Sequence, residues 1–523
     1  MPLTQLALCA ILAVGFSLAA SVPGRADAHP KKCFGKRVNR VVSGSGKTVR
    51  LKYRDVAWIA GDRVTVIGKP YSVVCADRGS QTVRAGKGRS RTSTGAGDDR
   101  IVLHRSSNRN VVRAGLGNDV IRGAKGHDTL DASPRRNPRG LPDRDVVHGL
   151  GGNDLIRDWS GEGNVLHGDT GSDRIHSLGD AVSTIYGGNG TDFLFANGGL
   201  TAGGRMERLF GERGNDRLKA DRSPTNGPAF LDGGSGDDWV YGTDRGDTVV
   251  FHSGITKVAT GPGDDLIVST SRGAATIDGG PGRDTMSYAA HTPPGYRGAS
   301  GVMVDLSAGT SVGAVRYSLK GIEDVSGSPF DDRILGADGV ANRISGGLGD
   351  DHLTGRPADG DTADGGRGQN RCEGFRQAVN CGQDSPGGDQ GRTVVDIDEG
   401  GVLTVMGSRS TDRVTIGYDL AAGRYRVELG APGVASGLCD GLAGGGRTIT
   451  CPADVNRLNG ILAYGNDGDD RIEIGASVPG TVTTTIDGGR GRNQLLGGRT
   501  KDYVLTAAGG SAGSVLEGRG GLD

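Results

Sequence analysis

The chain has few large aromatic residues and no excess of charge of either sign. Phe, Trp and Tyr make up 4% of its 523 residues, so a series of globular cores built around aromatic side chains is not expected. Basic and acidic residues both number 61, which gives a formal net charge of zero. A neutral chain has no overall field to recruit nucleic acid or an anionic membrane. We therefore expect neither as a partner.

One basic stretch departs from this balance. Residues 31–54 contain Lys and Arg repeatedly and no acid. Two interpretations are open: a solvated basic end of the protein, or a surface that contacts an anionic cell-wall or other extracellular polymer.

Long apolar runs are also missing after the first residues. The run from Leu6 to Ala20 is too short to span a bilayer comfortably, and Ala26-Asp27-Ala28 offers a small-x-small cleavage site. We predict a secretory signal peptide over residues 1–28 and a mature chain with no transmembrane segment. The expected location is therefore secreted, extracellular or at the cell surface.

Cysteine is sparse, with seven residues, one of them in the predicted signal peptide. An even number in an exported chain favours disulfides, and the remaining cysteines form three well-separated couples. Because no Cys-x-x-Cys occurs, zinc binding by these cysteines is disfavoured. We predict sequential pairing as Cys33–Cys75, Cys372–Cys381 and Cys439–Cys451.

Glycine is the residue in excess, at 97 of 523, against a usual share of roughly 7%. It recurs in a short phrase, a glycine-rich turn closed by Asp, as in Gly187-Gly188-Asn189-Gly190-Thr191-Asp192. Two positions after each closing acid stands an apolar residue, such as Leu194 after Asp192. Glycine permits the positive φ of a tight turn, and alternation in the following strand points that apolar residue inward. A single copy cannot bury it, so neighbouring copies must stack.

The spacing of the acids defines the stack. From Asp154 to Asp173 to Asp192 the interval is 19 residues each time, and Asp119 and Asp128 stand nine apart. A half-turn of nine and a coil of 18 or 19 residues describe one solenoid. The fold class that we predict is all-β, a parallel β-roll or β-helix solenoid with Gly/Asp-rich turns, plus a C-terminal β-rich module.

Stacked acidic turns require a counterion, because carboxylates repel at strand separations of roughly 4.8 Å. Calcium accepts six to eight oxygen ligands in flexible geometry, whereas magnesium prefers a strict octahedron with retained waters. We therefore predict Ca²⁺ as the cofactor and partner. The predicted metal ligands are Asp99, Asp119, Asp128, Asp154, Asp173, Asp192, Asp216, Asp238, Asp247, Asp265, Asp284, Asp332, Asp351 and Asp470.

The phrase resembles the Gly-Gly-x-Gly-x-Asp-x-apolar-x nonapeptide of the hemolysin-type calcium-binding, or RTX, family. The resemblance covers most of residues 94–372 and returns in 465–498. It implies a parallel β-roll, calcium held between successive turns, and export from the cell. The chain departs from the family in being neutral and in placing Arg beside several acids, which offers neutralisation without calcium. These arginines are Arg100, Arg174, Arg217, Arg333 and Arg471.

Changes in pattern divide the chain. We predict an N-terminal cap or degenerate coils over 29–93, the RTX-like solenoid over 94–381 and a linker over 382–392. A disulfide-stapled β-rich module over 393–464 and further RTX-like repeats over 465–523 follow.

Two rival functions remain beside a secreted calcium-binding repeat protein. One is a metal-independent structural or adhesive surface protein, and the less favoured one is a β-helix enzyme acting on polysaccharide. We predict no catalytic residues, since the nine histidines are scattered and no His-Glu-x-x-His motif occurs. His148, His167 and Tyr186 stand 19 apart and form either a stacked surface ladder or, as the less favoured alternative, a metal site.

Overall fold

A computed structural model shows an all-β chain with a single 3₁₀ turn at Pro357–Asp359 in its described part. It describes residues 32–135, 143–178, 182–197, 207–221, 227–270, 273–289, 301–313, 316–347, 349–366, 368–381, 393–397, 402–407, 411–431, 433–435, 439, 447–452, 460–464, 469–479, 482–487, 492–498, 501–505 and 515–517. The predicted signal peptide and the predicted linker over 382–392 lie outside these residues.

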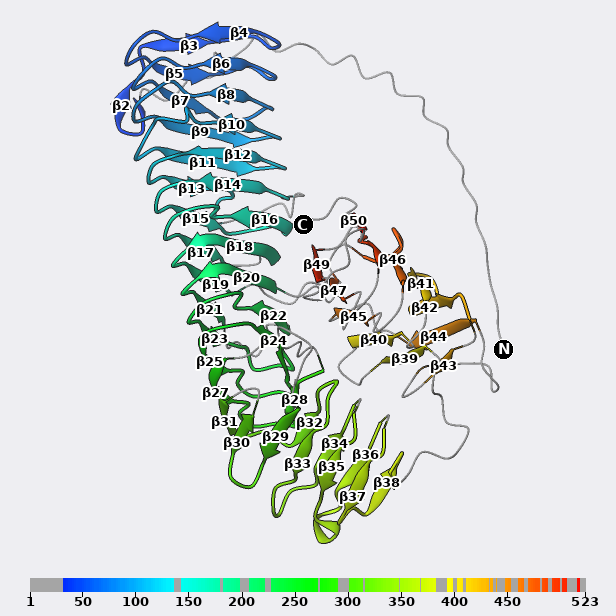
Figure 1. The fold of residues 1–523 in the computed structure, drawn as a ribbon. Helices are drawn as coiled ribbons and strands as arrows, with labels where there is room; N and C mark the ends of the chain where they lie inside the picture. The colour runs from blue at the N-terminus through cyan, green and yellow to red at the C-terminus, as the bar shows by residue number, and fades with distance from the viewer. Residues whose placement is uncertain are drawn as a thin grey trace, which may run out of the picture.

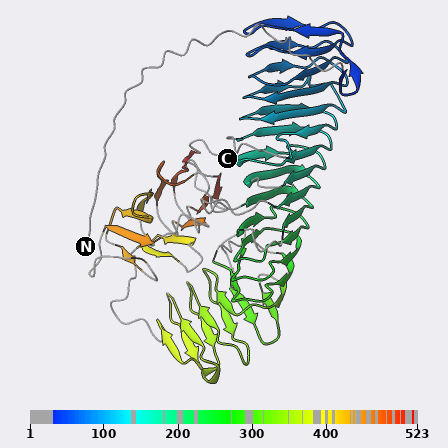
Figure 2. The same cartoon turned by 180° about the vertical axis from the view of Figure 1, so that it is seen from behind.

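Two parallel sheets run the length of a column and face each other across one core (Figures 1 and 2). Sheet I consists of β3 (Arg40–Val42), β5 (Val56–Ile59), β7 (Val73–Ala76), β9 (Arg91–Ala96), β11 (Val111–Leu116), β13 (Thr129–Asp131), β15 (Leu155–Asp158), β17 (Arg174–Ser177), β19 (Phe193–Ala196), β21 (Arg217–Ala220), β23 (Trp239–Tyr241), β25 (Ile255–Ala259), β27 (Ala274–Asp278), β29 (Val302–Asp305), β30 (Thr310–Gly313), β31 (Arg316–Lys320), β33 (Arg333–Leu335), β35 (His352–Thr354) and β37 (Arg371–Glu373).

Sheet II consists of β4 (Thr48–Arg50), β6 (Thr65–Ile67), β8 (Thr82–Arg84), β10 (Arg100–Val102), β12 (Val120–Ala124), β14 (Val146–Leu150), β16 (Glu162–His167), β18 (Val182–Gly190), β20 (Glu207–Gly214), β22 (Ala229–Asp232), β24 (Thr248–Phe251), β26 (Leu266–Ser269), β28 (Thr285–Ser287), β32 (Asp324–Ser326), β34 (Arg343–Ser345), β36 (Thr362–Asp364) and β38 (Gln377–Val379). The chain alternates between the two sheets, so each coil contributes one strand to each. The predicted parallel β-solenoid is confirmed.

The core is a ladder of single apolar residues, as the repeat requires. Ile156, Ile175 and Leu194 lie in register on successive strands of sheet I, and each is fully buried. The residue two positions after every predicted ligand is likewise buried, including Ile472 near the C-terminus. Each such strand thus adds one side chain to a continuous apolar interior. The stacking predicted from the Asp-x-apolar spacing is confirmed.

One hairpin interrupts the regular coils. β29 pairs antiparallel with β30, and β30 with β31, while β31 pairs parallel with β27 and β29 with β33. The hairpin therefore belongs to sheet I, and it remains paired with the coil before it and the coil after it.

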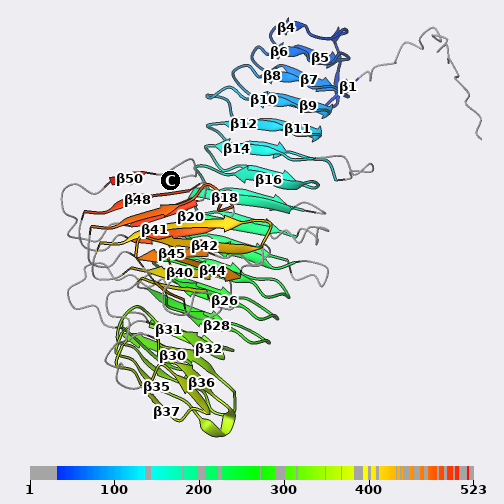
Figure 3. The same cartoon turned by 90° about the vertical axis from the view of Figure 1, so that its right-hand side faces the viewer.

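The C-terminal part contains two further sheets around a second core. Sheet III is β43 (Val434–Ala435), β39 (Val394–Ile397), β40 (Val402–Met406), β45 (Gly460–Tyr464), β47 (Thr483–Asp487) and β49 (Lys501–Leu505). Sheet IV is β44 (Thr448–Pro452), β42 (Arg424–Leu429), β41 (Arg413–Asp419), β46 (Arg471–Ile474), β48 (Gln494–Leu496) and β50 (Val515–Glu517). Strands before and after residue 464 share both sheets, and the strands from β45 onward pair in parallel. Figures 1 and 3 place this unit beside sheet II.

Three disulfides join the cysteines in the predicted sequential order. Cys33 lies on β1 (Lys32–Cys33), which pairs with β2 (Lys36–Arg37), and its bond to Cys75 fixes this hairpin beside sheet I. Cys372 on β37 of sheet I is bonded to Cys381, just after β38 of sheet II. The two bonds thus lie at opposite ends of the column, and Cys439–Cys451 lies in the C-terminal unit.

Candidate metal centre

The predicted ligands line both edges of the solenoid. Those that precede strands of sheet I are Asp128, Asp154, Asp173, Asp192, Asp216, Asp238, Asp332 and Asp351. Those that precede strands of sheet II are Asp99, Asp119, Asp247, Asp265 and Asp284, and Asp470 precedes β46 of the C-terminal unit. The nine-residue spacing of Asp119 and Asp128 is thus the step from one edge to the other. All of these aspartates are buried, with at most 3% of their surface exposed.

One carboxylate oxygen of each acid joins consecutive coils. The backbone N–H of Asp154 donates to Asp173 Oδ1 at 2.6 Å, and the N–H of Asp173 donates to Asp192 Oδ1 at 2.7 Å. At the other edge, the N–H of Asp99 donates to Asp119 Oδ1 at 2.7 Å. Each side chain therefore reaches back to the preceding coil, and the bonds form a ladder along each edge. We call these bonds the aspartate ladders.

The second carboxylate oxygen has no hydrogen-bond partner at most of these positions. The buried oxygens concerned are Oδ2 of Asp99, Asp119, Asp154, Asp173, Asp192, Asp216, Asp238, Asp284 and Asp351. A buried carboxylate oxygen without a donor costs about 1–3 kcal/mol or more, and a repeated deficit of this kind calls for a cation or a proton.

At Asp192 and Asp173 a glycine lies directly against that oxygen. A Cβ added at Gly187 would lie 2.7 Å from Asp192 Oδ2 and 2.8 Å from the carbonyl oxygen of Gly211 in the next coil. At Gly168 the same two kinds of atom, Asp173 Oδ2 and the Gly187 carbonyl, would each lie 2.5 Å away. At these turns the glycine five positions before the acid thus has a carboxylate and a carbonyl of adjacent coils close to it, whereas Thr94 and Ala114 stand at that position before Asp99 and Asp119. Such all-oxygen surroundings fit calcium, which binds carboxylate and backbone carbonyl oxygens.

Three predicted ligands differ, because a donor in their own turn also reaches the second oxygen. Asp247 Oδ2 accepts hydrogen bonds from the backbone N–H of Thr243 at 2.5 Å and from its hydroxyl at 3.1 Å. Ser328 donates in the same way to Asp332, and the N–H of Ala124 donates to Asp128 Oδ2. At these positions the acid completes a turn without needing an ion.

Burial raises the pKa of the ladder carboxyls far above the ordinary value of 3.8. The pKa of Asp154 rises to about 9, first through loss of hydration and then through the neighbouring carboxylates of Asp173 and Asp128. The pKa of Asp119 also rises to about 9, and that of Asp216 to about 8, with burial again the main cause. Without a cation, such groups hold protons near neutral pH.

The arginines beside the acids do not neutralise the ladders. In the described part of the chain, no ion pair joins Arg100, Arg174, Arg217, Arg333 or Arg471 to a ladder aspartate. Arg217 instead lies over the rings of Phe193, Trp239 and Tyr241 on the outer face of sheet I. Arg471 donates to Glu473. Neutralisation by outward arginine, which the sequence left open, finds no support in these contacts.

The sequence reasoning missed ladder members whose turns lack the glycine phrase. Asp145 accepts from the N–H of Asp119, Asp361 from that of Asn342, and Asp412 donates its N–H to Asp470. Each is followed two positions later by an apolar residue, Val147, Ala363 or Val414. The Asp-x-apolar half of the repeat was therefore the signal that identifies them, rather than the glycines.

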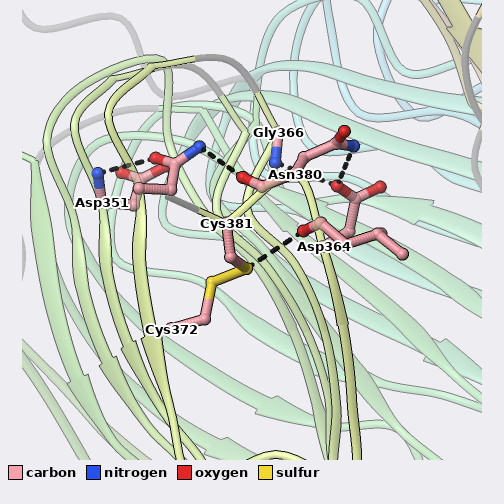
Figure 4. The surroundings of a disulfide bond; sticks show 8 residues. Asp351, Asp364, Gly366, Cys372, Asn380 and Cys381 are labelled. Atoms are coloured by element: carbon pink, nitrogen blue, oxygen red, sulfur yellow. Dashed lines mark hydrogen bonds between the residues drawn. A yellow bond between two sulfur atoms is a disulfide. The ribbon is translucent and has the colours of Figure 1, made fainter. Parts of the chain in front are cut away.

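Neutral side chains end the ladders. The N–H of Ser90 donates to Asn110 Oδ1, and the N–H of Asp351 donates to Asn370 Oδ1. The Asn370 amide donates in turn to the carbonyl of Asn380 at 3.2 Å. Figure 4 shows Asp351 and Asn380 in the surroundings of the Cys372–Cys381 bond. The amide oxygen of Asn takes the place of the Asp carboxylate oxygen as the hydrogen-bond acceptor. Because the amide is uncharged, it provides no carboxylate for a cation.

His148, His167 and Tyr186 form a stacked column on the outer face of sheet II. The rings of His148 and His167 are parallel with centroids 4.4 Å apart, and Tyr186 stacks on His167 at 4.6 Å. The stacked surface ladder, which was the favoured interpretation of these three residues, is confirmed.

These features define a class: a parallel β-solenoid whose glycine turns hold stacked, buried carboxylates. Residues 104–133, 182–199, 225–250, 319–353 and 482–511 match the model of the RTX calcium-binding nonapeptide repeat (4 copies). The chain thus carries RTX calcium-binding repeats, as the nonapeptide resemblance predicted. No curated protein matches the chain. In the described residues, no helix is long and apolar enough to cross a membrane.

Proposed function

We propose that this is an exported calcium-binding repeat protein in which Ca²⁺ between successive glycine turns orders the solenoid. The observation that carries the proposal is the repeated pair of a donorless Asp Oδ2 and a carbonyl oxygen of the next coil. Gly187, Asp192 and Gly211 are one example. Of the predicted ligands, those with a donorless Oδ2 are the proposed calcium ligands, and Asp128, Asp247 and Asp332 are proposed to act as turn residues only.

Export is supported by the disulfides, which persist in oxidising compartments, and by the apolar run near the start of the sequence. Extracellular calcium modules bind the ion at roughly 10⁻⁴ to 10⁻³ M. At a concentration ten times Kd, each independent site adds about 1.4 kcal/mol to the free energy of unfolding. Several sites together would rival the total stability of an ordinary domain, about 5–15 kcal/mol.

A metal-independent structural or adhesive protein is the second candidate, and the aspartate ladders favour it. Asp Oδ1 bonds such as Asp154 N–H to Asp173 link the coils without any ion. An enzyme is not favoured by the described residues. The sequence contains two Gly-x-Ser-x-Gly strings. The one at 309–313 enters the antiparallel strand β30, where Ser311 is buried, and does not lie at a strand-to-helix turn, and the one at 509–513 lies outside the described residues.

Calcium titration of the mature chain separates the two candidates. We expect metal analysis to find several bound ions, and circular dichroism and Tm to change strongly as calcium is added. Asp173→Asn should remove about one ion and about 1.4 kcal/mol of calcium-dependent stabilisation at ten times Kd. The matched control Asp247→Asn should lower Tm in chelator, because Thr243 loses an acceptor, yet keep the calcium-dependent increment. Equal Tm with and without calcium would leave the metal-independent scaffold as the function.

A further inference from the structure

Two imidazoles lie side by side on neighbouring strands of sheet II. His148 on β14 and His167 on β16 are direct register partners, and Tyr186 on β18 is the partner of His167. The two imidazole planes differ by 2°, and Tyr186 lies 6° from the plane of His167. The stack therefore holds two potential nitrogen ligands in place at one point of the outer face.

A carboxylate completes this group. Asp169 follows His167 by two residues, and its Oδ2 lies 3.4 Å from His148 Nδ1. The same oxygen accepts a hydrogen bond from the backbone N–H of Leu150 at 3.0 Å, which fixes the side chain toward the preceding coil. One ligand atom from each of His148, His167 and Asp169 lies within 4.8 Å of the other two.

We propose that His148, His167 and Asp169 form a binding site for a late first-row transition metal ion such as Zn²⁺, separate from the calcium turns. Two imidazole nitrogens and one carboxylate oxygen suit zinc, copper or nickel, whereas calcium prefers oxygen ligands alone. Three protein ligands leave a fourth position for water or an exogenous ligand. All three side chains are half-buried, so an ion can reach them from solvent.

Binding requires a local adjustment of the stack. Ligand atoms around a tetrahedral zinc ion lie roughly 3.4 Å apart, given metal–nitrogen distances of about 2.1 Å. The imidazoles must therefore tilt out of their parallel arrangement so that both lone pairs point at the ion.

Arg122 on β12 lies next to the site, because it is the register partner of His148 on the side away from His167. Its positive charge disfavours a cation nearby. Arg122→Ala removes this charge and is expected to lower the Kd for Zn²⁺. If the stack has no metal role, the substitution should not change zinc binding.

The site is distinct from the calcium ladder of the same coils. Asp169 stands four residues before Asp173 and takes no part in the ladder bond from Asp154 to Asp173. The charge of Asp169 does act on the carboxyls of Asp154 and Asp173. Loss of the transition-metal site through His167 should therefore leave the calcium response intact, whereas loss of Asp169 also changes the charge beside the ladder.

Isothermal titration of the mature chain with Zn²⁺ at saturating calcium tests the proposal, with Co²⁺ absorption as a report on nitrogen ligation. We expect one site that calcium and magnesium do not displace. His167→Phe keeps an aromatic ring in the stack but removes the nitrogen, and it should raise Kd at least about tenfold. Asp169→Asn should weaken binding as well, while the control His176→Phe, on the outer face of sheet I, should not.

Two results would overturn the proposal: no zinc binding, or zinc binding that His167→Phe leaves unchanged. In either case the stack has a packing role only. Calcium-dependent Tm, measured on every variant, shows that the fold is intact and separates failure of this site from failure of the calcium proposal.

Discussion

A glycine five residues before the acid lets oxygens of two coils approach the backbone closely at the turn of Asp192. The backbone at Gly187 does not need positive φ, yet its Cα faces Asp192 Oδ2 and the Gly211 carbonyl so closely that no side chain fits. The requirement at this position is therefore space beside ligand oxygens. This differs from Gly188 and Gly190, whose φ values of 107° and 154° shape the turn itself.

Gly187→Ala is accordingly expected to reduce stability by about 1–3 kcal/mol, the usual cost of overpacking, and to abolish calcium binding at its own turn. Equilibrium denaturation with and without calcium measures both effects. Gly151→Ala is the matched control, because the nearest atom to its added Cβ is the Thr170 hydroxyl at 3.2 Å, which can move. If both variants kept the full calcium increment, the proposed cage would be wrong.

The turn residues show which features of the candidate site could be predicted from the sequence and which could not. Burial of the residue two places after each acid follows from strand alternation alone, so Ile175 and Leu194 were predictable. The distinction between Asp173 and Asp247 was not predictable from the spacing of the acids, because it depends on whether Thr243 can donate a second hydrogen bond within its turn. Thr243 and Ser328 both stand four residues before their acid, where Gly188 stands before Asp192, so a hydroxyl residue in place of that glycine is the sequence signal for these two turns.

At the scale of the element, each aspartate ladder is a row of carboxyls that titrate together. Burial, together with a smaller effect of neighbouring carboxylates, raises the pKa of Asp284 and Asp351 to about 8. In the unfolded chain these groups titrate near 3.8. A raised folded pKa gives stability that is complete below the unfolded pKa and is lost as pH rises through the folded pKa.

The metal-free protein is therefore expected to lose stability steadily between about pH 4 and pH 9. Calcium should reduce this dependence, because it replaces the protons as the counterion of the ladder. Thermal unfolding followed by circular dichroism across this range, in metal-free and calcium buffers, provides the measurement. A metal-free Tm that stayed constant or rose with pH would contradict the assigned burial of the carboxyls.

The outer face of the turns carries a second row of hydrogen bonds with the opposite direction. The N–H of Ser172 donates back to Asn153 Oδ1 at 3.0 Å, whereas the Asp173 side chain accepts from the N–H of Asp154. Adjacent coils are thus joined both ways, and only the inner row involves buried carboxylates. The alternation of Asn and Asp at the outer position gave no sequence signal, since either side chain accepts equally well.

At the scale of the whole molecule, stability should vary along the column, because each coil contacts only its neighbours. The turns proposed to bind calcium lie mostly in the middle, whereas the first coils rely on Ser90, Asn110 and the Cys33–Cys75 bond. The pairing of cysteines was predictable from their separation into couples. The predicted domain boundaries stay predictions, although strands of the C-terminal unit pair across residue 464.

Replacing Cys33 and Cys75 by Ser is expected to destabilise the N-terminal coils by about 4 kcal/mol, the loop-closure contribution for a separation of 42 residues. Hydrogen exchange should then show lost protection for strands β3 to β8 and little change around β17 to β21. Uniform loss along the entire column would show that the solenoid unfolds as one cooperative unit instead.

The polarity of the aspartate ladders has one more consequence. Because every inner acceptor belongs to the later coil and every donor to the earlier one, a coil has its edge amide satisfied only when its successor arrives. Where Asp is the acceptor on both sides, as at Asp173 and Asp192, a coil presents to its successor the same donor that it meets in its predecessor. Duplication of such a coil accordingly preserves the hydrogen bond at each new junction.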